Sequence, residues 1–127
     1  MGTLNTDHNR VCWVDIPVVD LDRAIPFYTA VLKVAVTKEK FDDCDFAVLE
    51  HEEGNGGCLV IAPELVSEAG ALLYFNVHGR IRDATKQVAD HGGKILEDVH
   101  AIGPHGFRSV VLDCEGNRCA LHSEVDA

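Results

Sequence analysis

Asp15 is the first residue along the sequence whose position suggests chemistry. It lies in VCWVDIPV (Val11–Val18), where apolar residues alternate with Trp13, Asp15 and Pro17. Such alternation predicts a β-strand with one apolar face and one mixed face. A carboxylate beside an indole is a candidate general base, because a less polar environment raises its pKa. An exposed aspartate at the rim of a pocket is the alternative, and the sequence leaves both open.

Four histidines are further candidates, three of them (His100, His105 and His122) as acid–base groups near neutral pH and His51 as a member of a surface cluster. His122, the second candidate catalytic residue, shares a strand face with Ala120 by alternation, either as a ligand contact or as a structural histidine. His100 and His105 bracket the sequence AIGP, and we expect them either to border a pocket or to face solvent. His51 follows a predicted strand among three glutamates, which favours a solvated hairpin tip.

The order of predicted elements repeats about sixty residues apart. Each half reads as a strand, an amphipathic helix and three short strands. The first helix is expected to begin after Asp20, a good N-cap, and the second to stop at Gly92. We therefore predict one α+β domain over residues 1–127, with tandem βαβββ units at residues 10–62 and 71–123.

The mixed strand faces are predicted to form a cavity. The two helices are expected to cover the apolar strand faces, which leaves the other faces of two curled mixed sheets to surround a concave space. Small-molecule sites are concave and mostly apolar, with a few placed polar groups. The predicted ligand-binding residues are Trp13, Asp15, Leu72, Tyr74, Asn76, Ala120 and His122.

Composition excludes several classes of partner. The 127 residues include 21 acidic and 11 basic residues, a net charge of −10, without the Lys/Arg cluster of a nucleic-acid binder. No apolar stretch approaches the ~20 residues that span a bilayer, so no membrane partner is expected. The polar start shows no signal peptide, and its match to the short myristoylation pattern (Gly2, Thr6) is of a kind that occurs often by chance. Five cysteines without a CxxC pair fit reduced thiols, so a cytoplasmic protein is expected.

Several stretches resemble the vicinal oxygen chelate superfamily, which includes glyoxalase I, extradiol dioxygenases and bleomycin-resistance proteins. They are VDIPVVDLDRAIPFYTAVL, LLYFNV and LDCEGNRCALHS, while AIGPHGFRSVV is similar to a branch described only as glyoxalase-related. The likeness covers Arg10 to Ser123. It implies the duplicated fold and a homodimer, because members commonly pair their units, but it implies no particular reaction.

The resemblance also predicts where metal ligands would stand. Metal-using members carry His or Glu on the first and last strands of each unit, and these ligands hold a divalent ion that chelates the substrate. Three of the matching positions fall on Trp13, Leu72 and Ala120, and the fourth strand, residues 56–62, holds only the thiol of Cys58. One thiol does not make a metal site, so no metal and no cofactor are expected.

Two functions therefore remain open from the sequence. The first is a metal-independent protein that binds a small, partly aromatic molecule, with the acidic charge favouring neutral or cationic ligands. The second is a glyoxalase-related lyase or isomerase that uses unusual ligands (His51, Cys58, His122) or acid–base residues. A sensor or partner module is a weaker third alternative.

Overall fold

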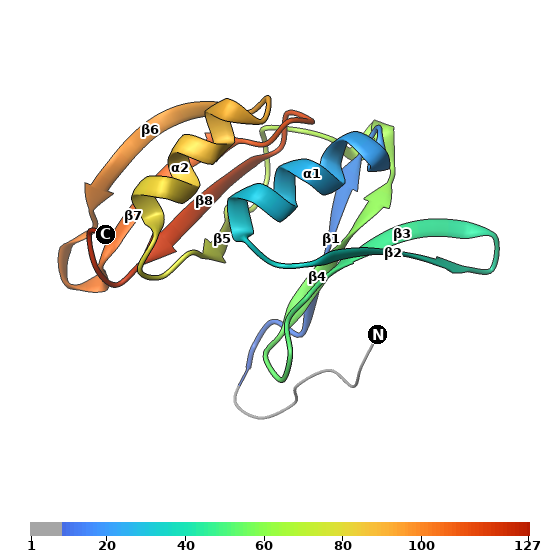
Figure 1. The fold of residues 1–127 in the computed structure, drawn as a ribbon, viewed down its shortest axis with the longest axis horizontal. Helices are drawn as coiled ribbons and strands as arrows, with labels where there is room; N and C mark the ends of the chain where they lie inside the picture. Colours follow the sequence, from blue (N-terminus) through green and yellow to red (C-terminus); the bar gives the residue numbers. More distant parts are fainter. Residues whose placement is uncertain (1–8) are drawn as a thin grey trace.

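The computed structural model describes residues 9–127 as two βαβββ units, each with a four-stranded mixed sheet (Figure 1). The signal-peptide and myristoylation predictions fall on residues 1–8, which lie outside the described residues. The elements of the first unit are β1 (Trp13–Val18), α1 (Leu21–Leu32), β2 (Val36–Phe41), β3 (Cys44–Leu49), β4 (Gly56–Ile61) and the short 3₁₀ turn η1 (Pro63–Leu65). Those of the second unit are β5 (Leu73–Asn76), α2 (Ile81–Asp90), β6 (Lys94–Ala101), the 3₁₀ turn η2 (Gly103–His105), β7 (Phe107–Leu112) and β8 (Arg118–Ser123).

The two sheets have the same topology, which confirms the predicted duplication. Their strand orders are β1-β4-β3-β2 and β5-β8-β7-β6, with β1 parallel to β4, β5 parallel to β8 and the other pairs antiparallel. β1 and β5 are therefore edge strands, a position that Pro17 tolerates because it has no N–H to donate. The sheets remain separate and do not close on each other.

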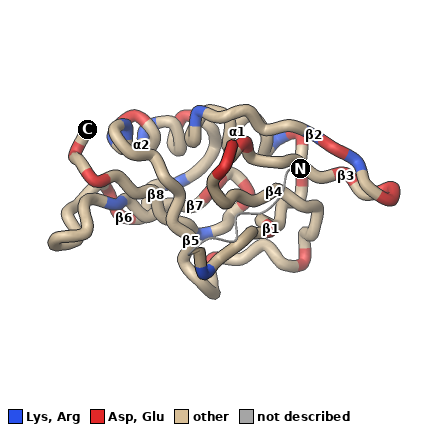
Figure 2. Tube along the Cα trace, turned by 90° about the horizontal axis from the view of Figure 1, so that it is seen from below, with Lys and Arg blue, Asp and Glu red and all other residues tan. Residues whose placement is uncertain are grey.

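Both helices lie on one side of β1, β4, β5 and β8 (Figure 2). α1 begins as expected, because the Asp20 carboxylate accepts a 3.2 Å hydrogen bond from the Arg23 amide. The chain leaves α2 through Gly92, whose φ of +91° favours glycine. The apolar faces of the helices and sheets form one core that continues across both units; its fully buried side chains include Val18, Ala24, Leu59, Ile81, Ala84, Val88 and Val111.

The turn before β8 joins the second unit to the first through a buried carboxylate. Asp113 is 3% exposed and accepts backbone hydrogen bonds from Glu115 (2.9 Å) and Asn117 (2.8 Å). It also accepts bonds from the Asn117 side-chain amide (3.0 Å) and the Tyr28 hydroxyl of α1 (2.5 Å). A buried charge of this kind is tolerated only when its hydrogen bonds are made.

The same turn fixes the end of β1 and the start of α1. The Glu115 carboxylate accepts hydrogen bonds from the amides of Val19 and Asp20 and pairs with Arg23. The Asn117 side chain donates a 2.7 Å hydrogen bond to the Pro17 carbonyl. We call residues 113–117 the clamp, because they position the first strand and helix against the second unit.

Charged residues are spread along both units (Figure 2). Several form exposed pairs, such as Lys38 with Asp22 (2.8 Å) and Arg82 with Asp126 (2.7 Å), which contribute little to stability because water and salt screen them. Within residues 9–127, neither helix has the length and apolar character needed to cross a membrane.

Replacing Tyr28 by Phe tests the clamp. The ring packing is kept, but the buried Asp113 carboxylate loses one hydrogen-bond donor. We expect a loss of about 1–3 kcal/mol in the free energy of unfolding, measured by urea denaturation. Tyr74→Phe makes the same chemical change on a 43% exposed side chain and should cost less than about 0.5 kcal/mol. Equal effects of the two changes would contradict the clamp.

Alkaline pH should destabilise the fold through buried thiols. Burial raises the pKa of Cys119 to about 12 and that of Cys114 to about 11, against about 8.5 in an unfolded chain. The unfolded chain therefore releases these protons first, so their contribution to stability is complete below pH ~8.5 and is lost as pH rises toward the folded values.

The urea midpoint should accordingly fall as pH rises from about 8 to about 10.5. Cys119→Ala should give a flatter pH profile, because it removes one of these groups. Cys44→Ala, at an exposed thiol, is the control and should follow the wild-type slope. Parallel profiles for the wild type and Cys119→Ala would refute this explanation.

Candidate functional site

Two large pockets and one smaller hollow border β5, an edge strand of the second sheet. The seam pocket, of about 850 Å³, lies between the units and is lined by residues that include Trp13, Val14, His51, Leu72 and Tyr74. The second-sheet pocket, of about 570 Å³, is lined by Tyr74, Phe75, Asn76, Ile102, His105, Arg108 and His122. The β5 residues Tyr74, Phe75 and Asn76 belong to both linings. β5 therefore presents side chains to both pockets.

Four of the predicted ligand-binding residues meet at the seam pocket. Trp13 comes from the first unit, and Leu72, Tyr74 and Asn76 come from the second. Strand alternation explains this placement, because Tyr74 and Asn76 point away from the core while Phe75 packs against it. Trp13 and Leu72 are half-buried, so both combine apolar surface with access to the pocket.

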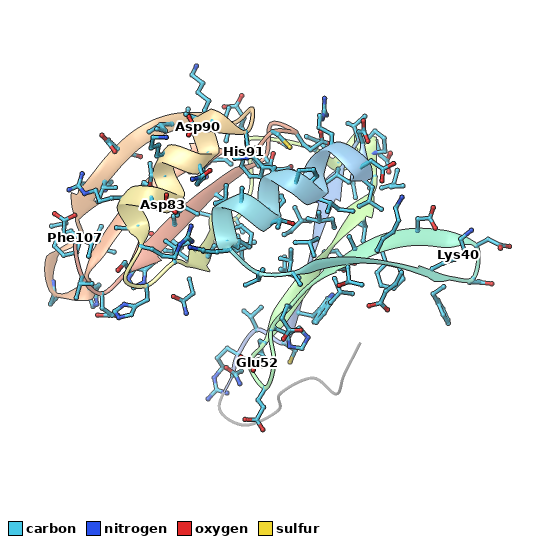
Figure 3. All side chains as sticks on the ribbon, viewed as in Figure 1. Lys40, Glu52, Asp83, Asp90, His91 and Phe107 are labelled. Carbon is cyan, nitrogen blue, oxygen red and sulfur yellow. The ribbon has the colours of Figure 1, made fainter. Side chains whose placement is uncertain are left out.

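His51 differs from the expected solvated hairpin tip. Its ring is half-buried and packs edge-on against Trp13, with the ring centroids 5.4 Å apart, and it lines the seam pocket. Its Nδ1 lies 2.8 Å from the Gly54 carbonyl, which fixes the ring across the turn. The neighbouring Glu52 does extend outward at the tip of the β3–β4 turn (Figure 3). The turn is exposed, but its histidine contributes to a pocket wall.

Asp15 is exposed and lies apart from His122, the other candidate catalytic residue. It lines a smaller hollow of about 180 Å³, whereas His122 lines the second-sheet pocket. Its carboxylate accepts a 3.3 Å hydrogen bond from the Cys58 thiol. Burial raises the pKa of the Cys58 thiol. A hydrogen bond with Trp13 opposes this rise and Asp15 adds to it. The thiol therefore stays protonated, and a protonated thiol is a poor metal ligand.

Ala120 is fully buried and lines neither of the two β5 pockets. In the second sheet it pairs with Tyr74 on one side and with Val110 on the other. Both neighbours have larger side chains, so the methyl group of Ala120 has no exposed surface.

The second-sheet pocket contains a chain of polar contacts. The His122 Nε2 atom lies 2.7 Å from the His105 backbone carbonyl oxygen. Nε2 must donate this hydrogen bond, because a carbonyl oxygen only accepts. Arg108 Nε donates to His100 Nε2 (3.1 Å), and Arg108 NH1 donates to the Tyr74 hydroxyl (2.6 Å). His100 Nδ1 lies 2.8 Å from the Asp98 carbonyl and must donate to it.

Arg108 was not among the residues predicted from the sequence. On β7 it pairs with His122 of β8 and with His100 of β6, so three residues from separate strands meet in one row of the sheet. The only sequence signal is the period of two in FRSVVL, which puts Arg108 on the face opposite the buried Ser109. Which strands pair with it is set by the tertiary fold.

The residues that the resemblance puts at the metal positions do not fit a metal ion. Trp13, Leu72 and Ala120 carry no donor suitable for a divalent cation, and β4 offers only the protonated thiol of Cys58. Across the described part of the chain, no group of three or more His, Cys, Asp or Glu side chains is arranged to hold a metal ion.

The hydrogen bonds predict opposite neutral tautomers for two histidines. His100 should carry its proton on Nδ1 and His122 on Nε2, because each of these nitrogens faces a carbonyl oxygen. Long-range ¹H–¹⁵N correlation spectra at pH ~8, above the ordinary histidine pKa of about 6.5, should show His100 as the Nδ1–H tautomer and His122 as the Nε2–H tautomer. The same tautomer at both positions would contradict the contacts described for this pocket.

Comparisons with known proteins agree with this architecture. The family model described as Glyoxalase/Bleomycin resistance protein/Dioxygenase superfamily matches residues 10–121. A glyoxylase-like domain-containing protein of Didymella fabae is 26% identical over 121 residues, which cover 90% of this chain and 93% of that protein.

Among solved structures, a glyoxalase-related enzyme from Fulvimarina pelagi is 16% identical, with a TM-score of 0.70, and the match covers 90% of this chain and 87% of that one. A fosfomycin resistance protein from Listeria monocytogenes is 12% identical, with a TM-score of 0.68 and coverage of 91% and 93%. A glyoxalase I mutant from Zea mays is 21% identical, with a TM-score of 0.71 and coverage of 89% of this chain and 45% of that one. At these identities the likeness is one of fold. From the family match and the duplicated βαβββ units, the chain belongs to the glyoxalase/bleomycin resistance protein/dioxygenase superfamily.

Proposed function

We propose that the protein binds a small, partly aromatic molecule at the pockets beside β5, without the divalent metal that metal-using relatives require. The observation that carries the proposal is that Tyr74, Phe75 and Asn76 line both pockets. Ligand sites usually have volumes of about 300–1,000 Å³ and combine apolar walls with a few polar groups. Both pockets fall in this range, and both have aromatic walls.

The metal-free part of the proposal is supported by the chemistry of the side chains at the metal positions. An indole, an isobutyl group and a methyl group replace the donors there, at Trp13, Leu72 and Ala120. At the first two positions the replacement is a large apolar side chain that lines the seam pocket. Such groups are suited to pack against an apolar ligand.

The alternative is a glyoxalase-related lyase or isomerase that uses acid–base residues. It is favoured by His105 and His122, which line one pocket together with Tyr74 and Arg108. His122 uses Nε2 to bond the His105 carbonyl, so Nδ1 is its other site for a proton. Turnover of small carbonyl compounds, followed by NMR with and without chelator, separates this activity from simple binding.

The homodimer and the cytoplasmic location remain parts of the proposal. Sedimentation at micromolar concentration is the direct test of the first, and a monomer there would exclude a dimer.

A titration of aromatic fragments tests the binding function. Trp13 is the only tryptophan and lies at the seam pocket, so bound fragments should change its fluorescence. Tyr74→Ala should weaken calorimetric binding about tenfold or more with little change in melting temperature, because this side chain is 43% exposed. Trp13→Ala should likewise weaken binding more than it weakens folding.

Phe41→Ala is the matched control, since it removes a 76% exposed aromatic side chain from the end of β2, outside both pockets. It should leave binding unchanged, and so should a chelator. The metal-free proposal would be overturned if an unchelated preparation contained stoichiometric divalent metal that was lost together with ligand binding on mutation of His122 or Asp15. Equal loss of binding for Phe41→Ala and Tyr74→Ala would contradict a site at β5.

A further inference from the structure

The second-sheet pocket contains hydrogen-bond donors, and none of its described lining residues is acidic. Its polar lining within residues 9–127 consists of Tyr74, Asn76, His105, Arg108 and His122, without an Asp or Glu. This lining contrasts with the chain as a whole, in which 21 acidic residues outnumber 11 basic ones. The local charge of the pocket is therefore opposite in sign to that of the protein.

Arg108 is held in place without being neutralised. Its half-buried guanidinium donates through Nε to His100 and through NH1 to Tyr74, and neither contact is with a carboxylate. Glu97, whose Oε1 lies 3.9 Å from His100 Nε2, is not paired with Arg108. Among residues 9–127, no carboxylate lies within ion-pair distance of Arg108, whereas Arg80 and Arg82 each have one.

His100 supports this arrangement as a neutral acceptor. Its Nδ1 donates to the Asp98 carbonyl, which leaves the lone pair of Nε2 for Arg108. The guanidinium has five N–H donors, two of which are used in these contacts, so three remain. A guanidinium with free donors on both terminal nitrogens matches the two oxygens of a carboxylate or phosphate.

Two neighbouring side chains can donate to the same anion. The Tyr74 oxygen accepts from Arg108, so its own hydrogen is available. The side-chain oxygen Oδ1 of Asn76 accepts a 2.9 Å hydrogen bond from the His78 backbone amide. This contact orients the side-chain NH₂ group of Asn76 as a donor. Phe75, Ile102 and the Tyr74 ring supply apolar surface in the same pocket.

We propose that Arg108, with Tyr74 and Asn76, forms an anion-recognition site, and that the ligand of this protein carries a carboxylate or phosphate group on a small apolar or aromatic body. This inference rests on the proposed binding function and names the ligand class. It departs from the expectation of neutral or cationic ligands based on net charge, because a half-buried guanidinium acts at contact distance, whereas exposed charges farther away are screened by salt.

Four probes of similar shape test the inference by ¹H–¹⁵N NMR titration: benzoate, phenyl phosphate, benzamide and benzylamine. Benzoate or phenyl phosphate should bind at least about tenfold more tightly than benzamide and benzylamine. Binding should change the backbone amide chemical shifts of residues in η2, β7 and β8. The ratio of the two anion affinities distinguishes a carboxylate site from a phosphate site. Added salt should weaken the binding of both anions.

Arg108→Gln should weaken anion binding about 10- to 100-fold and leave benzamide binding within about twofold. Arg108→Lys keeps the charge without the planar donor pair, so its anion affinity should lie between those of the wild type and Arg108→Gln. Arg82→Gln removes the same charge from α2, outside the pocket, and should bind the anions like the wild type. Wild-type-like spectra of each variant establish that it is folded.

The possible outcomes separate this inference from the proposed function. If benzamide binds the pocket as tightly as benzoate and phenyl phosphate, or if Arg108→Gln binds the anions like the wild type, the anion site is refuted and small-molecule binding stands. If none of the four probes shifts pocket resonances at tens of millimolar, both proposals are refuted. Equal losses of anion affinity in Arg108→Gln and Arg82→Gln would indicate a general charge effect and would also overturn the site.

Discussion

The arrangement of the two units depends on one buried carboxylate. Asp113 accepts four hydrogen bonds, two from backbone amides of its own turn, one from the Asn117 side chain and one from Tyr28 of the other unit. Because an unpaired buried carboxylate is costly, the turn and the helix must both adopt the positions that complete this set. Burial raises the pKa of Tyr28 well above its usual value, and Asp113 adds to the rise, so the hydroxyl remains a donor.

The clamp matters for the site because the seam pocket has walls from both units. Trp13 comes from β1, whose end is held by the bond from Asn117 to the Pro17 carbonyl, while Tyr74 comes from β5, beside β8. The fold therefore fixes the distance between two aromatic walls through a turn outside the pocket. The second-sheet pocket, by contrast, is built within one sheet, where strand pairing aligns Arg108 with His122 and His100.

This difference explains what the sequence predicts and what it does not. Hydrophobic periodicity and the Asp20 cap were sufficient to predict α1, and alternation correctly put Tyr74 on the face away from the core, because both signals are local. Arg108 could not be recognised in the same way, since its partners are eight or more residues away and the strand register is a tertiary property. The contact between His51 and Trp13 likewise depends on how the β3–β4 turn folds back onto β1.

A crystal structure of the protein with bound phenyl phosphate would show directly whether a small molecule binds beside β5. We expect the phosphate within hydrogen-bond distance of Arg108, and the phenyl ring against Tyr74 and Phe75. Phenyl phosphate bound only away from Arg108 and Tyr74, at the hollow next to Asp15 or on the outer face of the helices, would contradict this site.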